Sequence, residues 1–459
     1  MKNIMYFCIP AHGHHNPTLP VVTELVRRGN KVRYFSFEEF REKIEKTGAE
    51  FIPCDSFMPE LTKEEEDGLK KVSATEMSVV DLRITARMDE FLGKQVAEFK
   101  PDVIVTDSVC FWGKLTARKY KIPMVVSTTT FAFNKYSSGY MKSSAAEIMD
   151  LMKGMKRVNA ELKALEKYGY HEKSIMPLVQ NDNYTDTIVY ASKRYQPCAE
   201  TFSKHYAFVG PSLASDYQPQ KEHERPLVYI AMGTVINDRP DFYKNCIEAL
   251  SGENVDIIIS CGKTMDIAGL GELPENVQVY PYVNQLEILS KANVFLTHCG
   301  MNSVSESLYM ATPMVLFPQT NEQRAVEKRV LEMGAGVSLK GDSVEAIREA
   351  FSAILNQKSY GEKAAECSRD FREAPGSKGA AEFVETAPHL MPEEDKRLLM
   401  LDMLPGLLQL LFWVAAVALI IVLPRVTSVK WWILAIAANI IFIPFKQLSG
   451  RIIAGRAFS

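Results

Sequence analysis

The sequence lacks several features that mark common classes of protein. Its eight cysteines are scattered and none forms a C-x-x-C pair, which argues against a zinc or redox site of that kind and is typical of reduced thiols. Its 53 lysines and arginines are outnumbered by 56 acidic residues, so it has no basic excess of the kind that nucleic-acid binders show. The first residues lack the length and the cleavage site of a signal peptide, so we expect a cytoplasmic body.

Two nucleotide-binding motifs are missing as well. There is no G-x-x-x-x-G-K-[ST], which excludes a P-loop nucleotidase. There is no G-x-G-x-x-G after the first apolar run, which argues against an NAD-dependent enzyme. Since 47% of the residues are hydrophobic, the chain can still bury sizeable cores.

Short apolar runs alternate with helical segments in two successive halves of the chain. The strands predicted in the first half are Ile4–Ile9, Val32–Phe37, Val103–Thr106 and Met124–Ser127. Those predicted in the second half are Leu227–Ala231, Val255–Ser260, Val277–Tyr280, Val294–Thr297 and Met314–Phe317. Apolar strands separated by helices indicate parallel sheets covered on both faces. We therefore predict an α/β protein with domains at 1–210 and 227–392, a linker at 211–226, and a ligand cleft at the carboxyl ends of the strands.

The C-terminal segment 398–459 has a different composition. It contains two uncharged apolar runs, 403–424 and 431–445, and five basic residues but no acid from position 403 onward. The first run has the length of about 20 residues that a spanning helix needs. We expect a hairpin of membrane helices that anchors the protein at the cell membrane and leaves both domains in the cytoplasm. The alternative is a buried helical hairpin.

Polar loops follow two of the strands predicted in the first half. The loop after the first strand contains His12, His14 and His15 but no H-x-x-x-H zinc pattern. A histidine at the carboxyl end of a strand can accept a proton near neutral pH. Asp107 ends another strand at the same edge, and a carboxylate beside such a histidine fixes its tautomer. The alternatives are ordinary loop histidines and an aspartate that only caps the next helix.

A third motif, T-H-C-G-M-N-S-V-S-E over residues 297–306, joins a strand to a helix. Asn302 and Ser303 open this helix, and the free N–H groups of a helix N-terminus bind phosphate well. Glu306 falls one turn further on the same side, where a carboxylate can accept hydrogen bonds from sugar hydroxyls. The motif therefore predicts a site for a phosphate and a sugar.

This motif resembles the donor-binding signature of the family 1 UDP-glycosyltransferases. Thr312-Pro313, Glu322-Gln323, the Pro10–Pro17 loop and the Gly233-Thr234 turn extend the resemblance, chiefly to the branch of bacterial macrolide glycosyltransferases. It covers about residues 1–390 and implies the GT-B fold, with an acceptor-binding and a donor-binding Rossmann-like domain facing a cleft. It also implies an inverting transfer of a hexose, glucose by default, from a UDP-sugar to a hydroxyl of a small, lipophilic acceptor. No metal or other cofactor is expected, in line with the absence of Asp-x-Asp.

The resemblance assigns roles to individual residues. His14 matches the catalytic base and Asp107 the acid paired with it. The positions matching donor-binding residues are Thr234, Tyr282, Val283, Gln285, His298, Gly300, Asn302, Ser303, Glu306, Glu322 and Gln323. Tyr282-Val283-Asn284-Gln285 departs from the Trp-x-Pro-Gln that is common in the family. Two other functions stay open: a sugar-nucleotide epimerase or hydrolase on the same fold, and a non-catalytic, membrane-anchored sugar-nucleotide-binding protein.

Overall fold

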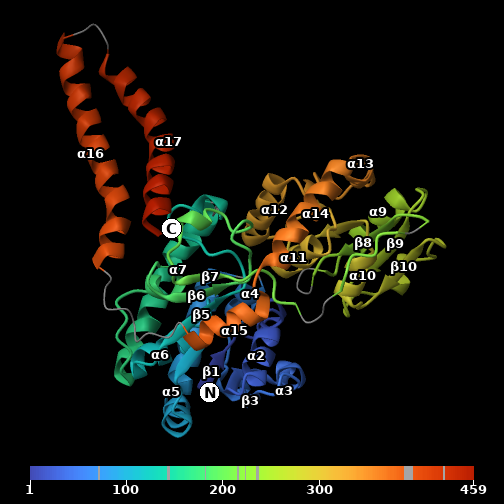
Figure 1. Ribbon diagram of the computed structural model, residues 1–459, viewed down its shortest axis with the longest axis horizontal. Coiled ribbons are helices and arrows are strands. Elements are labelled where there is room, and N and C mark those ends of the chain that lie inside the picture. Colours follow the sequence, from blue (N-terminus) through green and yellow to red (C-terminus); the bar gives the residue numbers. More distant parts are fainter. Residues whose placement is uncertain are drawn as a thin grey trace.

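The structure is a computed structural model, and the residues it describes fall into nine segments. These are 1–70, 73–141, 145–180, 182–213, 217–222, 224–233, 237–386, 396–426 and 430–458. Two parallel sheets with helices packed against them form the body, and a pair of helices extends from it (Figure 1).

The first sheet has seven parallel strands in the order β3-β2-β1-β4-β5-β6-β7. Its strands are β1 (Asn3–Phe7), β2 (Lys31–Ser36), β3 (Glu50–Pro53), β4 (Val103–Asp107), β5 (Met124–Thr128), β6 (Asp186–Val189) and β7 (Tyr206–Phe208). The helices of this half are α1 (His12–His15), α2 (Thr18–Arg27), α3 (Arg41–Glu45), α4 (Lys63–Lys70), α5 (Ala74–Phe99), α6 (Phe111–Tyr120), α7 (Ala145–Ala164) and α8 (Met176–Val179). The strand order reverses at β1, which has β2 on one side and β4 on the other. In open parallel sheets, ligands bind at the carboxyl ends of the strands at such a point.

The second sheet has six parallel strands in the order β10-β9-β8-β11-β12-β13. Its strands are β8 (Leu227–Ala231), β9 (Asp256–Ser260), β10 (Val277–Tyr280), β11 (Val294–Thr297), β12 (Met314–Leu316) and β13 (Gly336–Ser338). The helices that follow β8 are α9 (Pro240–Leu250), α10 (Gln285–Lys291), α11 (Met301–Tyr309), α12 (Asn321–Met333), α13 (Val344–Asn356), α14 (Lys358–Glu373) and α15 (Gly376–Thr386). The prediction of two parallel-sheet domains is confirmed.

Helix α15 packs on the first domain although it follows the second in sequence. Its residues Ala380, Ala381 and Val384 are buried in the core of the first sheet. Glu385 accepts hydrogen bonds from Arg28 at 3.0 Å and from Asn30 at 2.6 Å. The chain therefore passes between the domains twice, once in the predicted linker and once just before α15.

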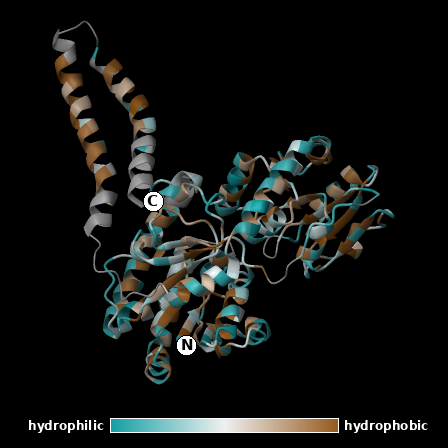
Figure 2. Ribbon diagram, viewed as in Figure 1, coloured by the Kyte–Doolittle hydropathy of each residue, from teal (hydrophilic) through white to brown (hydrophobic). Residues whose placement is uncertain are grey.

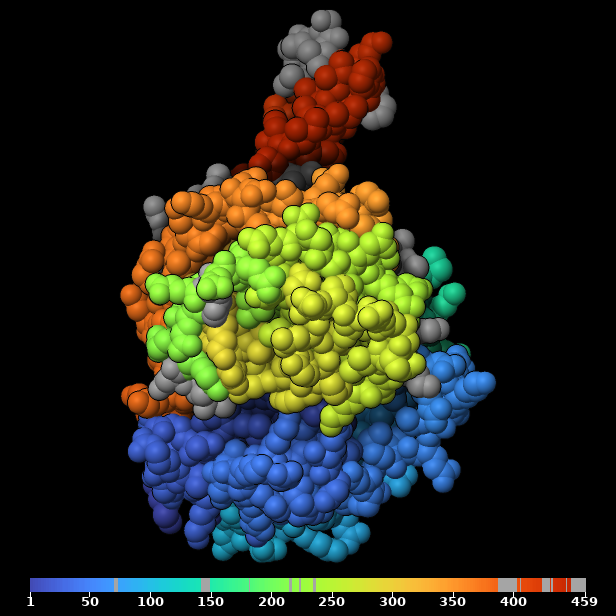
Figure 3. Space-filling view, turned by 90° about the vertical axis from the view of Figure 1, so that its right-hand side faces the viewer, coloured from blue at the N-terminus to red at the C-terminus, as the bar shows by residue number. Residues whose placement is uncertain are grey.

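The C-terminal segment forms two paired helices, α16 (Lys396–Val426) and α17 (Trp431–Phe458), which project from the body (Figure 3). Phe412 stacks on Phe445 with ring centroids 5.0 Å apart. Hydrophobic residues occur along much of both helices (Figure 2). Among them, Val414 and Ile440 are 59% and 65% exposed.

The prediction of membrane-spanning helices at 403–424 and 431–445 is not supported. Within the part of the chain that the structure describes, no helix combines the length and the apolar character that crossing a membrane requires. The helical hairpin itself is present, and its second helix is longer than the predicted apolar run.

Candidate active site

His14 and Asp107 lie together at the carboxyl end of the first sheet. His14 belongs to the short helix α1 after β1, and Asp107 is the last residue of β4, the parallel neighbour of β1. His14 Nδ1 lies 2.6 Å from Asp107 Oδ2. The side chain of Asp107 is fully buried, whereas that of His14 is 27% exposed. The predicted pair is therefore assembled, with the histidine on the accessible side.

The hydrogen bond to Asp107 fixes the tautomer of His14. Asp107 is a carboxylate and accepts, so Nδ1 carries the proton and Nε2 is the basic nitrogen. The other oxygen of Asp107 accepts from the Val109 N–H at 2.9 Å, in the turn before α6. The N-cap of α6 is Cys110, so Asp107 does not cap that helix, which the alternative interpretation had expected. Burial lowers the pKa of His14, but the charge and hydrogen bond of Asp107 outweigh it and raise that pKa above its usual value, with help from Glu322.

The two neighbouring histidines, His12 and His15, contact other groups of the protein and not Asp107. His15 is buried, stacks on Phe40 with ring centroids 3.7 Å apart, and lies 2.6 Å from Ser36 Oγ through Nε2. Burial lowers the pKa of His15 to about 4, so it is neutral at physiological pH. His12 pairs with the exposed Glu39 at 3.0 Å. Of the three histidines in this loop, His14 is the one that combines a buried carboxylate partner with an accessible ring.

Thr129 is a contact of His14 that the sequence analysis missed. Its hydroxyl lies 3.2 Å from Nδ1 of His14, next to the bond to Asp107. Thr129 directly follows β5, whose neighbour β4 ends in Asp107. Its position at the carboxyl end of a predicted strand was the available signal.

His298 lies between two glycines at the start of the second domain's motif. A Cβ on either Gly233 or Gly300 would lie 2.5 Å from the imidazole, and Gly233 has φ +80, so only glycine fits there. Nδ1 of His298 is buried, and no hydrogen-bond partner for it is present among the described residues. Burial lowers the pKa of His298 to about 4, against the effect of a backbone hydrogen bond with Ala231, so the ring is neutral. A neutral imidazole has one N–H, and the tautomer that carries it on Nδ1 can donate to an anion without adding charge.

Helix α11 begins beside this histidine, with Gly300 as its N-cap and Asn302 and Ser303 in its first turn. Its leading N–H groups have no partner within the helix and form an anion-binding end. The diphosphate residues that the sequence predicts therefore converge, except Thr234, which lies outside the described residues.

Glu306, Gln285 and Ser303 form a second polar group on α10 and α11. Gln285 Nε2 donates to Glu306 at 2.6 Å and to Ser303 Oγ at 3.2 Å, while the Tyr229 hydroxyl donates to Gln285 Oε1 at 3.3 Å. Burial raises the pKa of Glu306 to about 7, and the bond from Gln285 opposes this shift. A carboxylate so placed can accept hydrogen bonds from ligand hydroxyls.

The remaining predicted donor residues lie just before α10 or in the first turn of α12. Tyr282 is 75% exposed and presents an open aromatic ring, and Val283 beside it is partly buried. Glu322 and Gln323 lie in the first turn of α12. Gln323 Oε1 accepts from the backbone of Gln319 and Thr320 in a capping box, so only its Nε2 is left to donate to a ligand.

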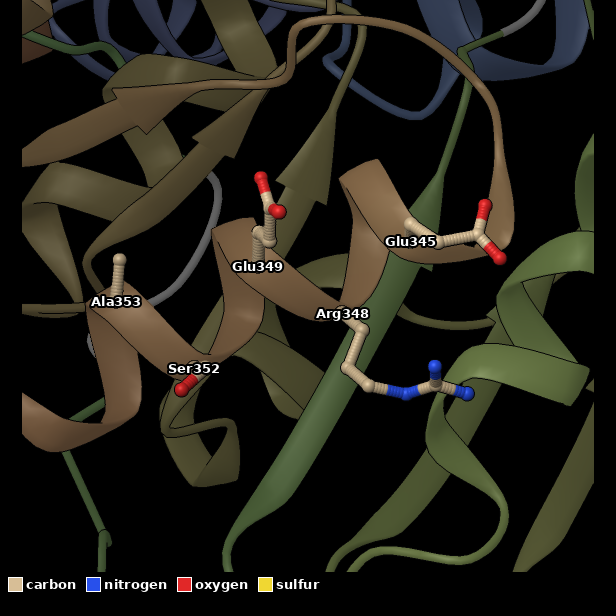
Figure 4. Close-up of a pocket in the computed structure, with 5 residues that line it drawn as sticks. All are labelled: Glu345, Arg348, Glu349, Ser352 and Ala353. Carbon is tan, nitrogen blue, oxygen red and sulfur yellow. The ribbon is translucent and has the colours of Figure 1, made fainter.

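The described residues offer no cluster for a metal ion, and one hollow of the molecule lies away from this site. No group of three or more His, Cys, Asp or Glu side chains there is arranged to hold a metal ion. A hollow of about 540 Å³ lies elsewhere, along one face of α13 (Figure 4). Its lining residues all come from that single helix: Glu345, Arg348, Glu349, Ser352 and Ala353.

Comparisons of the sequence with known proteins identify glycosyltransferases as its relatives. The family described as "UDP-glucoronosyl and UDP-glucosyl transferase" matches residues 211–378. An NDP-glycosyltransferase of Bacillus licheniformis, YjiC, is 34% identical over 84% of this chain and 97% of its own. The oleandomycin glycosyltransferase of Streptomyces antibioticus is 27% identical over 83% of this chain and 90% of its own.

A solved structure gives the same result for the fold. The crystal structure of CalG4, the calicheamicin glycosyltransferase, superposes with a TM-score of 0.68 and 27% identity, over 84% of this chain and 98% of that one. The GT-B fold, with its two Rossmann-like domains, is thereby confirmed. The chain belongs to the family 1 UDP-glycosyltransferases, which transfer a sugar from a nucleotide sugar to an acceptor.

Proposed function

We propose that the protein is an inverting, metal-independent hexosyltransferase. It moves a hexose, glucose by default, from a UDP-sugar to a hydroxyl of a small, lipophilic acceptor, with His14 as the base. The observation that carries the proposal is the 2.6 Å bond between Nδ1 of His14 and the buried Asp107, which leaves Nε2 as a proton acceptor.

In this mechanism, the acceptor hydroxyl gives its proton to Nε2 of His14 while its oxygen attacks the anomeric carbon. Asp107 stabilises the imidazolium that forms. The bond from the anomeric carbon to the diphosphate breaks in the same displacement, which inverts the configuration at that carbon. The base and the leaving group lie on opposite domains, so the reaction requires both.

The negative charge on the departing UDP is stabilised by the second domain. The N-terminus of α11 supplies N–H groups, and neutral His298 supplies a further donor. Thr234 is proposed as another diphosphate contact. These donors replace the metal ion that other transferases use. Glu306 and Gln285 would hold the ribose, Tyr282 and Val283 the uracil, and Glu322 and Gln323 the sugar.

We also propose that the enzyme is associated with the cell membrane through α16 and α17, with its catalytic domains in the cytoplasm. The support is the row of exposed apolar side chains on both helices, because such surfaces mark sites of membrane or protein contact. Full-length protein should float with phospholipid vesicles in a density gradient. The double variant Leu410→Glu, Val414→Glu should float less, and wild-type protein that stays at the bottom would contradict the proposal.

The experiment for the proposed activity measures UDP release from a panel of UDP-sugars, with and without hydroxylated apolar acceptors. A transferase releases UDP in an acceptor-dependent manner and gives a product heavier than the acceptor by one hexose. UDP release without acceptor would indicate a hydrolase. Conversion of the sugar while it stays attached to UDP would indicate an epimerase. Binding of UDP-sugars with neither outcome would indicate a non-catalytic binding protein. EDTA should leave the activity unchanged.

A further inference from the structure

One hydrogen bond joins the donor-binding helix to the loop of the proposed base. Asn302 Nδ2, in the first turn of α11, donates to the backbone carbonyl of Gly13 at 2.9 Å. Gly13 directly precedes His14 in α1. The bond therefore links the two domains across their cleft, at the residue next to the base.

The same side chain lies where an anion would bind. Asn302 is in the first turn of α11, so its amide nitrogen lies at the helix end that attracts phosphate. That nitrogen carries two hydrogens, and the carbonyl of Gly13 takes one of them. The second hydrogen remains for an oxygen of a bound diphosphate. One nitrogen can thus hold the donor and the His14 loop at the same time.

We propose that Asn302 is a positioning residue that couples donor binding to the placement of His14. A bound donor accepts a hydrogen bond from the amide of Asn302, and the same amide donates to the carbonyl of Gly13. The ring of His14 is thereby fixed relative to the anomeric carbon. Loss of this bond leaves the base intact but less well placed, and such misplacement lowers the rate of the chemical step. This inference rests on the proposed function, because it assumes that His14 acts on the acceptor.

The kinetic test compares Asn302→Ala with Ser303→Ala. Ser303 also lies in the first turn of α11, but its bond is to Gln285 in its own domain. We expect Asn302→Ala to lower kcat about tenfold at saturating substrates, the usual effect of one lost hydrogen bond. Ser303→Ala should raise the donor KM with a smaller loss of kcat. If the two variants changed KM and kcat in the same proportions, the proposal would be overturned. Asn302→Asp keeps the shape but cannot donate, and should lose kcat like Asn302→Ala.

A second readout does not depend on turnover. In full-length protein with isotope-labelled histidine, the NMR signal of His14 is assigned by its loss in His14→Ala. Saturating UDP should shift this signal in wild-type protein and in Ser303→Ala, and shift it clearly less in Asn302→Ala. An equal shift in all three proteins would overturn the coupling even if no acceptor is ever found. Failure of transfer with the coupled shift intact would count only against the proposed function.

Discussion

The three histidines of one loop differ in what surrounds each ring. Stacking and burial keep His15 neutral, exposure leaves His12 beside a surface glutamate, and Asp107 holds His14 by one nitrogen. From the strands alone, the sequence placed this loop and Asp107 at one edge of the sheet, because neighbouring parallel strands end there. The choice of His14 among the three came from the resemblance to the family. The sequence did not predict Thr129, since a threonine after a strand is no chemical signal by itself.

The pH dependence of the reaction should follow the pair of His14 and Asp107. The raised pKa of His14 means that the unprotonated base forms only as pH rises through a value above about 6.5. We expect kcat/KM to increase with a midpoint above that value. Asp107→Asn removes the charge that raises the pKa, so its midpoint should move to lower pH while kcat falls. An unmoved midpoint would show that another group titrates.

Donor binding should depend on the ionisation of Glu306. Its pKa of about 7 means that the carboxylate, the form proposed to accept from ribose hydroxyls, predominates only above neutral pH. UDP should therefore bind more tightly at pH 8 than at pH 6. Calorimetry with Glu306→Gln should give weaker binding and lose that part of the pH dependence. Identical pH profiles for variant and wild type would place Glu306 away from the nucleoside.

Among the elements, the predicted strands agree with the structure to within two residues at either end. The four strands that were missed, β3, β6, β7 and β13, have three or four residues each, and three of them lie at sheet edges. Such short strands carry too little apolar pattern to be told from loops and are defined by the neighbour they pair with. Between β2 and β3 the chain forms a 3-10 turn, Glu38–Phe40, followed directly by α3.

The capping box of α12 gives a prediction at the scale of an element. Thr320 accepts from the N–H of Gln323 and fixes the turn that carries Glu322. Thr320→Ala should lower the free energy of unfolding by about 1 kcal/mol and raise the donor KM. Ser343→Ala removes the matching cap of α13, on another helix, and should cost similar stability without changing the KM. Equal KM effects would show that the change is not local to α12.

At the scale of the whole molecule, the contacts between the domains could not be predicted from the sequence. The bond from Asn302 to Gly13 joins residues 289 positions apart, and Glu385 on α15 reaches back to Arg28 and Asn30. No local pattern encodes such pairs, because they depend on how two independently folded sheets are oriented. The amphipathic pattern of α15 indicates a packed helix but not the domain on which it packs.

The return of α15 to the first domain should contribute to stability. Glu385→Ala removes a part-buried acceptor from Arg28 and Asn30, and should lower the free energy of unfolding by about 1–2 kcal/mol in urea titrations. Glu382→Ala, an exposed glutamate on the same helix, should change it by less than about 0.5 kcal/mol. Equal losses in the two variants would mean that the contact contributes nothing specific.

The proposed role of His14, removal of the acceptor's proton, is tested by comparing alanine variants of the three histidines. UDP release is measured with donor and acceptor for wild type, His14→Ala, His12→Ala and His15→Ala, and UDP affinity is measured for each. We expect His14→Ala to lose nearly all acceptor-dependent release while it binds UDP like wild type. His12→Ala and His15→Ala should keep most of that release. Near-normal release by His14→Ala, or loss confined to His12→Ala or His15→Ala, would contradict the proposed role.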